Sequence, residues 1–351
     1  MDERQVFKKH LELVKTESLL PIKVSEFYNK KVENEVKHIG IGGPLYRSVY
    51  PVSEIFDVYA GEKNRDFADE QAYTIDNFII KRYPTEVLVL ITERCFSHCQ
   101  YCFRSLNITT IKKDNPMDKI EVLYDYLIKN PQIKEVIFSG GDPMVLKLEE
   151  WKAILKKFSK WDIRIHTRSI VYDPTVFSED IIKLFSKYNV RLVFHINHPY
   201  EICKTVKDKI NLLRNYKIRM YAQFPLLRGI NDNIEVLKKL LYMLDELSIR
   251  TLSFFIVDAI KYSSAYRISF DRIEKILNEL NWTTPSWVNS TRLIMHTSIG
   301  KVRREDIVCR KRNVIIFHRD DKKVKYIDFP KKLDIPGDIK KLLWKDYILN
   351  Q

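Results

Sequence analysis

Three cysteines, Cys95, Cys99 and Cys102, stand within eight residues of one another in a C-x3-C-x2-C pattern. Three thiolates on one short loop can hold three irons of a [4Fe–4S] cluster and leave the fourth iron without a protein ligand. Zinc is the alternative, but a structural zinc site takes four ligands. This spacing is not that of a usual zinc finger, even with His98 inside the loop. The pattern therefore predicts one iron–sulfur cluster with an open iron.

Polar side chains and scarce glycines recur after the cysteine loop. Only 9 glycines are present, and the segment Gly140 to Pro143 (GGDP) uses two of them. Glycines of this kind let the backbone approach a ligand closely, although an ordinary tight turn is the alternative. Further polar groups follow at Thr167, Arg168, His195, His198, Gln223 and Asp258. Two structural interpretations stay open beside these: His198 as a core histidine before a proline, and Asn231 or Asp232 as a helix cap.

From Val87 onward, short apolar β-rich runs alternate with longer amphipathic runs, which is typical of a parallel βαβ sheet. The expected strands are 87–92, 135–139, 163–167, 191–196, 219–224 and 251–257. Each expected helix follows its strand, and this order predicts an α/β fold, a partial (β/α)6 barrel of parallel strands. The polar groups fall at successive strand ends, so we expect them to converge on one cavity.

The pattern divides the chain into three parts. Residues 1–85 form an N-terminal extension of helical and irregular character, 86–282 form the barrel, and 283–351 form a C-terminal segment. Within that segment we expect a β-hairpin over 314–330, because apolar alternation brackets a polar turn at Asp320, Asp321 and Lys322.

Charge and composition exclude several classes of protein. Lys and Arg total 60 against 46 Asp and Glu, but the lysines are spread through the chain as on a solvated surface, so nucleic acid is not an expected partner. The stretch 301–312 is more basic and is a candidate surface for an acidic partner. An odd count of 5 cysteines argues against a disulfide framework. No signal-peptide core or membrane-length apolar run is present, so we expect a cytoplasmic protein with no membrane partner.

The cysteine loop, with Tyr101 just before its last cysteine, resembles the cluster motif of the radical S-adenosylmethionine (SAM) superfamily. The resemblance implies that Cys95, Cys99 and Cys102 bind a [4Fe–4S] cluster, that SAM binds the open iron, and that an electron from a donor such as flavodoxin or ferredoxin cleaves SAM to a 5′-deoxyadenosyl radical. It also implies a set of SAM contacts: Tyr101 at the adenine, Gly140, Gly141 and Asp142 at the amino group, and Thr167 and Arg168 at the carboxylate and ribose.

A narrower resemblance is carried by a series of motifs in order: the KRYP at 81–84, the CFR at 102–104, the HINHP at 195–199, the QFPLLRGIND at 223–232, and Asp258. Together these are similar to the lysine 2,3-aminomutase family. That family implies pyridoxal phosphate (PLP) as a cofactor, carried by Lys301 with its phosphate at Arg82. It also implies Arg104 at the substrate carboxylate and Asp258 at a distal ammonium. We assign catalytic roles to Arg104, His195 and Asp258, and cofactor contacts also to His195 and Gln223.

The sequence departs from the family around Lys301. Only Gly300 precedes this lysine where the family has several glycines, and Asn289, Met295 or His296 stands near the place of a second substrate aspartate. One hypothesis keeps PLP and predicts an amino-acid 2,3-aminomutase acting on another small amino-acid-like substrate, or on a protein-bound lysine. The other drops PLP and predicts a PLP-independent radical isomerase, epimerase or dehydrogenase on the same scaffold. A separate structural interpretation makes Lys301 an exposed surface lysine in a basic run. A homo-oligomer is left open.

Overall fold

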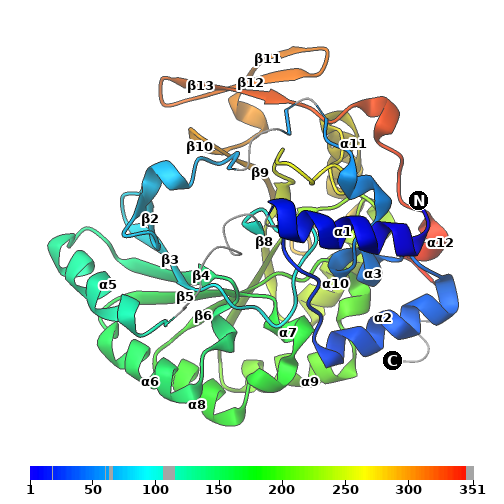
Figure 1. The fold of residues 1–351 in the computed structure, drawn as a ribbon. Helices are drawn as coiled ribbons and strands as arrows, with labels where there is room; N and C mark the ends of the chain where they lie inside the picture. The colour runs from blue at the N-terminus through cyan, green and yellow to red at the C-terminus, as the bar shows by residue number, and fades with distance from the viewer. Residues whose placement is uncertain (18, 60, 63–65, 106–114, 345–351) are drawn as a thin grey trace.

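The computed structural model describes residues 1–17, 19–59, 61–62, 66–105 and 115–344. Ten strands form one sheet in the order of the sequence (Figure 1). They are β1 (Thr74–Ile75), β2 (Ile79–Tyr83), β3 (Glu86–Thr92), β4 (Glu135–Gly140), β5 (Asp162–Thr167), β6 (Arg191–Phe194), β7 (Arg219–Leu226), β8 (Arg250–Ile256), β9 (Arg292–Thr297) and β10 (Gly300–Val302). Neighbouring strands from β3 to β9 pair in parallel, and the outer pairs are antiparallel.

The α/β fold is confirmed, and all six expected strands form as β3 to β8. One parallel strand was not expected: β9 lies in what the sequence suggested was a separate C-terminal segment, yet it pairs with β8 through Ser253 and Arg292. The inner surface of the sheet therefore continues past residue 282. Among the described residues the strand ladder does not close on itself, so the structure is an open, curved sheet.

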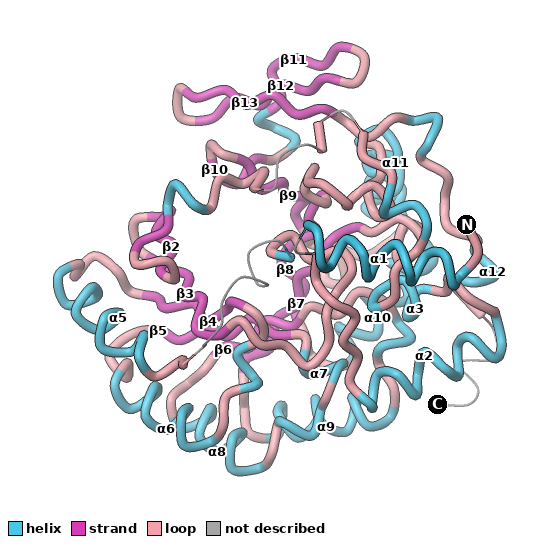
Figure 2. Tube along the Cα trace, in the orientation of Figure 1, coloured by secondary structure: helices cyan, strands magenta, loops and turns pink. Residues whose placement is uncertain are grey.

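Helices cover the outer face of the curved sheet, while the strands line its interior (Figure 2). The outer helices are α5 (Asp118–Lys129), α6 (Leu148–Lys157), α8 (Glu179–Lys187), α9 (Lys204–Asn215), α10 (Ile234–Glu246) and α11 (Phe270–Thr283), with the short α7 (Ser169–Tyr172) after β5. In β3, Val87, Val89 and Ile91 are fully buried, whereas the alternate residues Glu86 and Leu88 face a cavity. Because successive side chains of a strand point to opposite faces, β3 buries one set of side chains in the core and presents the other set to the cavity.

Side chains connect the two ends of the open sheet. The Tyr73 hydroxyl donates to the Ser298 carbonyl at 3.1 Å, and the Lys301 amide donates to the Tyr83 hydroxyl at 3.2 Å. The Arg82 guanidinium also donates to the Thr297 carbonyl. These bonds bring β2 and β10 to the same side of the cavity although the two strands do not pair.

The N-terminal extension holds the cysteine loop. It consists of α1 (Glu3–Glu17), α2 (Glu26–Ile39) and α3 (Pro44–Val49), drawn in blue in Figure 1. The His98 amide donates to the Lys23 carbonyl at 2.8 Å, and its Nδ1 donates to the Pro21 carbonyl at 2.7 Å. The Gln100 amide donates to the Ser48 carbonyl at 3.0 Å. The loop is therefore fixed by backbone that precedes it by some 50 to 75 residues in the sequence.

The C-terminal segment forms a second, antiparallel sheet of β11 (Ile307–Lys311), β12 (Val314–Arg319) and β13 (Lys322–Ile327). Arg319 pairs with Lys322, and the two intervening residues, Asp320 and Asp321, have φ of 48° and 62°. The structure thus contains the expected hairpin with its expected turn. The basic stretch 301–312 is divided between β10 and β11.

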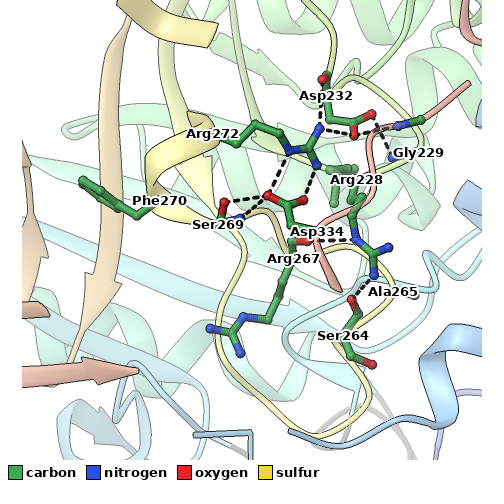
Figure 3. Close-up of polar contacts among 12 residues, drawn as sticks. Arg228, Gly229, Asp232, Ser264, Ala265, Arg267, Ser269, Phe270, Arg272 and Asp334 are labelled. Atoms are coloured by element: carbon green, nitrogen blue, oxygen red, sulfur yellow. Dashed lines mark hydrogen bonds and ion pairs between the residues drawn. The ribbon is translucent and has the colours of Figure 1, made fainter. Parts of the chain in front are cut away.

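A buried ion cluster attaches the tail to the barrel (Figure 3). Arg272 of α11 donates to Asp232, in the loop after β7, at 2.7 Å and to Asp334, in the tail, at 2.9 Å. Asp232 also accepts from the amides of Gly229 at 2.9 Å and Gly337 at 3.0 Å. The tail continues to α12 (Ile339–Leu342). In the described part of the chain, no helix has the length and apolar character needed to cross a membrane.

Candidate active site

A cavity of about 290 Å³ lies within the curved sheet, and all of the predicted site residues line it. The loop after β3 contributes Cys95, Cys99, Tyr101, Cys102 and Arg104; the ends of β4 and β5 contribute Gly140, Gly141, Asp142, Thr167 and Arg168; the positions after β6, in β7 and after β8 contribute His195, Gln223 and Asp258; and β2 and β10 contribute Arg82 and Lys301. Segments far apart in the sequence thus meet at one place, because parallel strands end at the same face of the sheet.

His198 is the exception among the polar groups expected at the cavity. It is fully buried, and its Nδ1 accepts from the Tyr200 amide at 3.1 Å, at the start of a 3₁₀ turn over Pro199–Glu201. The expectation that it reaches the cavity was wrong, and the core interpretation holds. The proline after it starts a turn that leads the side chain away from the strand end.

The three thiols lie along one wall of the cavity and are free of disulfides. Burial, followed by the nearby Asp142 and the other two thiols, raises the pKa of Cys95 well above its ordinary value, and burial together with Cys99 raises the pKa of Cys102 to about 12. Such a set binds as thiolates only where a cationic centre offsets the charge. Irons supply that charge, so the donor set fits a [4Fe–4S] cluster.

The three thiols do not surround a site for a single metal ion. Among the described residues, no group of three His, Cys, Asp or Glu side chains stands in an arrangement that could hold a metal ion. The Cys99 sulfur instead lies 3.0 Å from the Tyr172 hydroxyl. A [4Fe–4S] cluster needs no such convergence, because each of the three thiolates binds a different iron.

The two glycines of the GGDP segment are required by the cysteine loop itself. Gly140 has φ of 117°, and a Cβ there would lie 2.2 Å from the Thr92 carbonyl oxygen. A Cβ on Gly141 would lie 2.3 Å from the Arg94 carbonyl oxygen. The amide of Gly141 donates to Thr92 at 2.6 Å. The glycines thus let the chain after β4 pack directly against the start of the cysteine loop.

Asp142 and Thr167 bond to each other across the ends of β4 and β5. The Thr167 hydroxyl donates to Asp142 at 2.7 Å, and Asp142 also accepts from the amides of Arg168 at 2.9 Å and Met144 at 3.0 Å. Burial raises the pKa of Asp142. In this arrangement the two side chains orient the backbone around the cavity.

Arg168 has both an anchor and free donors. Its Nη2 donates to Glu201 at 2.6 Å in a buried ion pair, and its guanidinium lies 4.6 Å from the Tyr172 ring and 5.7 Å from the Tyr101 ring. Its Nε and Nη1 are buried and have no partner in the described part of the chain. Glu201, which also accepts from the Tyr28 hydroxyl at 2.9 Å, was missed by sequence reasoning because it reads as a helix-start residue.

Arg104 is paired with another residue that the sequence did not reveal. Glu70 accepts from its Nε at 2.9 Å and from its Nη2 at 2.7 Å. Asp258 lies close to this pair: burial, together with the charges of Glu70 and Asp66, raises its pKa to about 7. Glu70 precedes the barrel by sequence and lies in an irregular segment, so no periodic pattern marked it.

Besides His98 of the cysteine loop, the imidazoles of His166, His195 and His296 line the cavity, and of these only His195 was predicted as a site residue. The Gln223 amide nitrogen lies 3.1 Å from His195 Nε2 and 3.3 Å from His166 Nδ1. Burial lowers the pKa of His195 and of His296 to about 3 and that of His166 well below its ordinary value. All three rings are therefore neutral. His166 was visible in the sequence as the centre of a polar strand end.

Lys301 and Arg82 lie together at the side where β2 and β10 approach. The Lys301 amine is 5.3 Å from the centre of the Tyr83 ring, and burial lowers its pKa. The Arg82 guanidinium lies 4.4 Å from the Tyr73 ring, and its Nε is buried without a partner among the described residues. The alternative in which Lys301 is a surface lysine was wrong, because the residue is half-buried and lines the cavity.

The chain is similar to several known proteins. The model of the Radical SAM superfamily matches residues 89–241. The chain is 32% identical over 174 residues to L-lysine 2,3-aminomutase of Fusobacterium nucleatum, covering 48% of this chain and 41% of the relative. It is 26% identical over 243 residues to L-lysine 2,3-aminomutase of Escherichia coli, covering 68% and 70%. A radical SAM methyltransferase from Sphaerobacter thermophilus superposes with a TM-score of 0.47 at 12% identity, covering 62% and 68%.

The similarity is partial in length. The chain spans about half of the Fusobacterium protein and of a Treponema pallidum relative, 41% and 58% of their lengths. The matched region contains the cysteine loop, the GGDP segment and the cavity residues of β5 to β7, but Arg82, Asp258 and Lys301 lie outside it. Residues 89–241 therefore match the model of the Radical SAM superfamily, and the chain is similar to proteins named L-lysine 2,3-aminomutase.

Proposed function

We propose that this protein is a radical SAM enzyme of the aminomutase type, which moves an amino group between neighbouring carbons of an amino-acid-like substrate with PLP on Lys301. One observation carries the proposal: a single cavity is lined both by the cysteine loop and by Arg82 and Lys301. When bound, the cluster and SAM supply a 5′-deoxyadenosyl radical, and PLP supplies the electronic delocalisation through which an amino group migrates.

The residues near the cysteine loop are suited to hold SAM. Arg168 offers two free donors, and a guanidinium binds a carboxylate best with two parallel bonds. Glu201 and the Tyr172 ring keep the Arg168 plane in place. Tyr101 borders the same part of the cavity and offers an aromatic face to a base. An external one-electron donor, such as flavodoxin or ferredoxin, completes the reaction.

The residues between β2 and β10 are suited to hold PLP. A lysine whose pKa is lowered by burial has a larger neutral fraction, and the neutral amine is the nucleophile that attacks an aldehyde. Arg82 has a free buried Nε that can donate to a phosphate oxygen. Both cations lie without a carboxylate ion-pair partner among the described residues, so an anionic cofactor would balance them.

One observation favours a second candidate, a PLP-independent radical isomerase, epimerase or dehydrogenase. Lys301 pairs with His296 in the short β9–β10 ladder, and only Gly300 precedes it. This pairing restrains the backbone of the lysine. The protein-bound lysine alternative keeps PLP and differs only in the substrate.

The cluster is tested by absorbance of anaerobically purified protein. A broad visible iron–sulfur band is expected for the parent chain and for Cys203→Ala, a half-buried cysteine at the start of α9 that serves as control. Cys99→Ala should lose the band and the formation of 5′-deoxyadenosine from SAM. A colourless parent protein after reconstitution with iron and sulfide would refute the radical mechanism.

PLP is tested by borohydride reduction followed by peptide mass spectrometry. A pyridoxyl group is expected on Lys301, and the same label should be absent from Lys301→Ala but present in Lys311→Ala, which changes an exposed lysine on β11. If the parent chain carries no label while it still forms 5′-deoxyadenosine, the PLP-independent candidate is supported instead.

A further inference from the structure

The cavity has an excess of buried hydrogen-bond donors. The buried side-chain atoms of its lining residues that lack a partner in the described part of the chain are Arg82 Nε, Arg164 Nε, His166 Nε2, Arg168 Nε, Arg168 Nη1 and His296 Nε2. All are nitrogens, and a guanidinium nitrogen can only donate. Since unpaired buried donors are costly, the molecules that fill this cavity have to bring acceptors.

The cofactors of the proposed function satisfy only some of these donors. Arg168 serves SAM and Arg82 serves PLP, which leaves Arg164, His166 and His296. Arg164 and His166 are alternate residues of β5, so both face the cavity, and His296 faces it from β9. Electrostatic coupling links both imidazoles to Lys301 and Arg104, which places them around the same part of the cavity.

The hydrogen bonds around His166 assign its proton. The amide nitrogen of Gln223 lies between the two rings and carries two hydrogens, one for His166 Nδ1 and one for His195 Nε2. Both of these ring nitrogens then accept, so His166 carries its own proton on Nε2. The orphaned atom of His166 is therefore a donor.

Arg164 is fixed from its other side. Its Nη2 donates to Glu135 at 2.9 Å and to Glu86 at 3.2 Å, and these two strand-start carboxylates hold the guanidinium in place. The free Nε is thus presented by a side chain that cannot turn away. A rigid donor of this kind gains affinity for an acceptor because little side-chain entropy remains to be lost.

Resting on the proposed function, we infer that the substrate is an α-amino acid whose side chain ends in a carboxylate, with that carboxylate bound by Arg164, His166 and His296. Two carboxylate oxygens offer about four acceptor positions, enough for Arg164 Nε, His166 Nε2 and the Nε2–H tautomer of His296. An ammonium has three donors and no acceptor, so it would leave Arg164 Nε and His166 Nε2 unpaired. It would also add a positive charge beside Arg164 and Lys301.

Besides Asp142, three carboxylates that would suit an ammonium line the cavity, Glu70, Glu86 and Asp258; Glu70 pairs with Arg104 and Glu86 with Arg164, which leaves Asp258. It lines the cavity, and no hydrogen bond to its carboxylate is formed within the described residues. Its surroundings are already acidic, since Glu70 and Asp66 act on it, and burial with these charges raises its pKa to about 7. Comparing the binding affinities of a dicarboxylic amino acid and of lysine therefore shows whether the cavity prefers a side-chain carboxylate or a side-chain ammonium.

Binding tests the inference without turnover. Protein reconstituted with cluster, PLP and SAM, and kept free of reductant, is titrated by isothermal calorimetry with L-glutamate, L-aspartate and L-lysine. L-Glutamate or L-aspartate should bind at least about tenfold more tightly than L-lysine. Equal or tighter binding of L-lysine overturns the inference.

Variants locate the binding group. Arg164→Lys keeps a charge for Glu86 and Glu135 but removes Nε, and His296→Phe keeps a ring next to Phe255 but removes the donor. Each should weaken binding of the dicarboxylic amino acid by about tenfold and leave L-lysine unchanged. The matched control is Arg191→Lys, which changes an arginine on β6 that pairs with Asp162 at 2.7 Å and does not line the cavity.

The outcomes separate the inference from the function on which it rests. Thermal melting shows which variants remain folded, and His166→Phe provides a third variant if one does not fold. Parent-like binding of L-glutamate and L-aspartate by the folded variants overturns the inference. Absence of the cluster band and of 5′-deoxyadenosine, with the preference for the dicarboxylic amino acid intact, overturns the proposed function and leaves the binding preference standing.

Discussion

Several buried arginines of the described chain are paired with carboxylates, whereas Glu35 is a buried carboxylate without a cationic hydrogen-bond partner there. Arg168 pairs with Glu201, Arg104 with Glu70 and Arg267 with Glu62. Glu35 of α2 is fully buried and has only amide partners, accepting from Leu45 at 3.0 Å and Tyr46 at 2.8 Å. Burial raises its pKa from its ordinary value of 4.5 to about 7.

This carboxylate predicts a pH dependence of stability. Between the two pKa values the folded chain keeps a proton that the unfolded chain has lost, so stability falls as pH rises through that window. The loss, on the order of 3 kcal/mol, should appear between about pH 5 and about pH 8 in the free energy of unfolding and should be absent in Glu35→Gln. Glu33→Gln, an exposed change on the same helix, should retain the parent profile. Parallel profiles for Glu35→Gln and the parent would show that Glu35 does not titrate in this range.

At the scale of elements, the cysteine loop depends on two neighbours that precede and follow it. The N-terminal extension accepts hydrogen bonds from His98 and Gln100, and the turn after β4 packs its glycines against Thr92 and Arg94. The loop is thus held from both sides, which suits a site whose three thiolates have to bind one cluster.

The contact of His98 with the extension predicts how well the cluster is protected. His98→Ala removes the bond from Nδ1 to the Pro21 carbonyl and keeps the backbone bond to Lys23. We expect the visible band to bleach in air several-fold faster, about two- to tenfold, as expected for one lost hydrogen bond. His318→Ala, on β12, is the control. An unchanged bleaching rate would show that the extension does not protect the cluster.

At the scale of the whole molecule, the tail is joined to the barrel by the Arg272 cluster of Figure 3. Asp232 and Asp334 are buried and share this one guanidinium, while Ser269 donates to Asp334 at 2.9 Å through its amide. The loop after β7, the start of α11 and the tail are therefore held at one point. Removing the cation leaves two buried carboxylates without their counter-ion.

Arg272→Met should lower the free energy of unfolding by about 3–5 kcal/mol, as expected when one partner of a buried pair is removed. Lys331→Met breaks a pair with Asp271 on the surface, where Lys331 is 71% exposed, and should cost less than about 1 kcal/mol. Chemical denaturation of the two variants and the parent measures the difference. A similar small cost for both variants would mean that the cluster does not stabilise the tail.

The sequence by itself determined the cysteine loop, the order of the strands and most of the polar groups that line the cavity. The spacing of three cysteines, the order of strand and helix patterns, and the polar groups at strand ends were sufficient, because each depends on residues close together in the chain. The hairpin at Asp320 and Asp321 was also local and was predicted correctly.

Only the tertiary structure decided which charges are satisfied. Glu70 and Glu201 lie far in sequence from the arginines that they bind, β9 became part of the main sheet by pairing with β8, and Lys301 reached the cavity because β2 and β10 approach each other. His198 turned away for an equally non-local reason, the packing of the turn after β6. Local sequence patterns specify which polar groups are present. Which of the buried donors remain without a hydrogen-bond partner depends on contacts between residues far apart in the sequence, so only the tertiary structure reveals the donors that are available to a substrate.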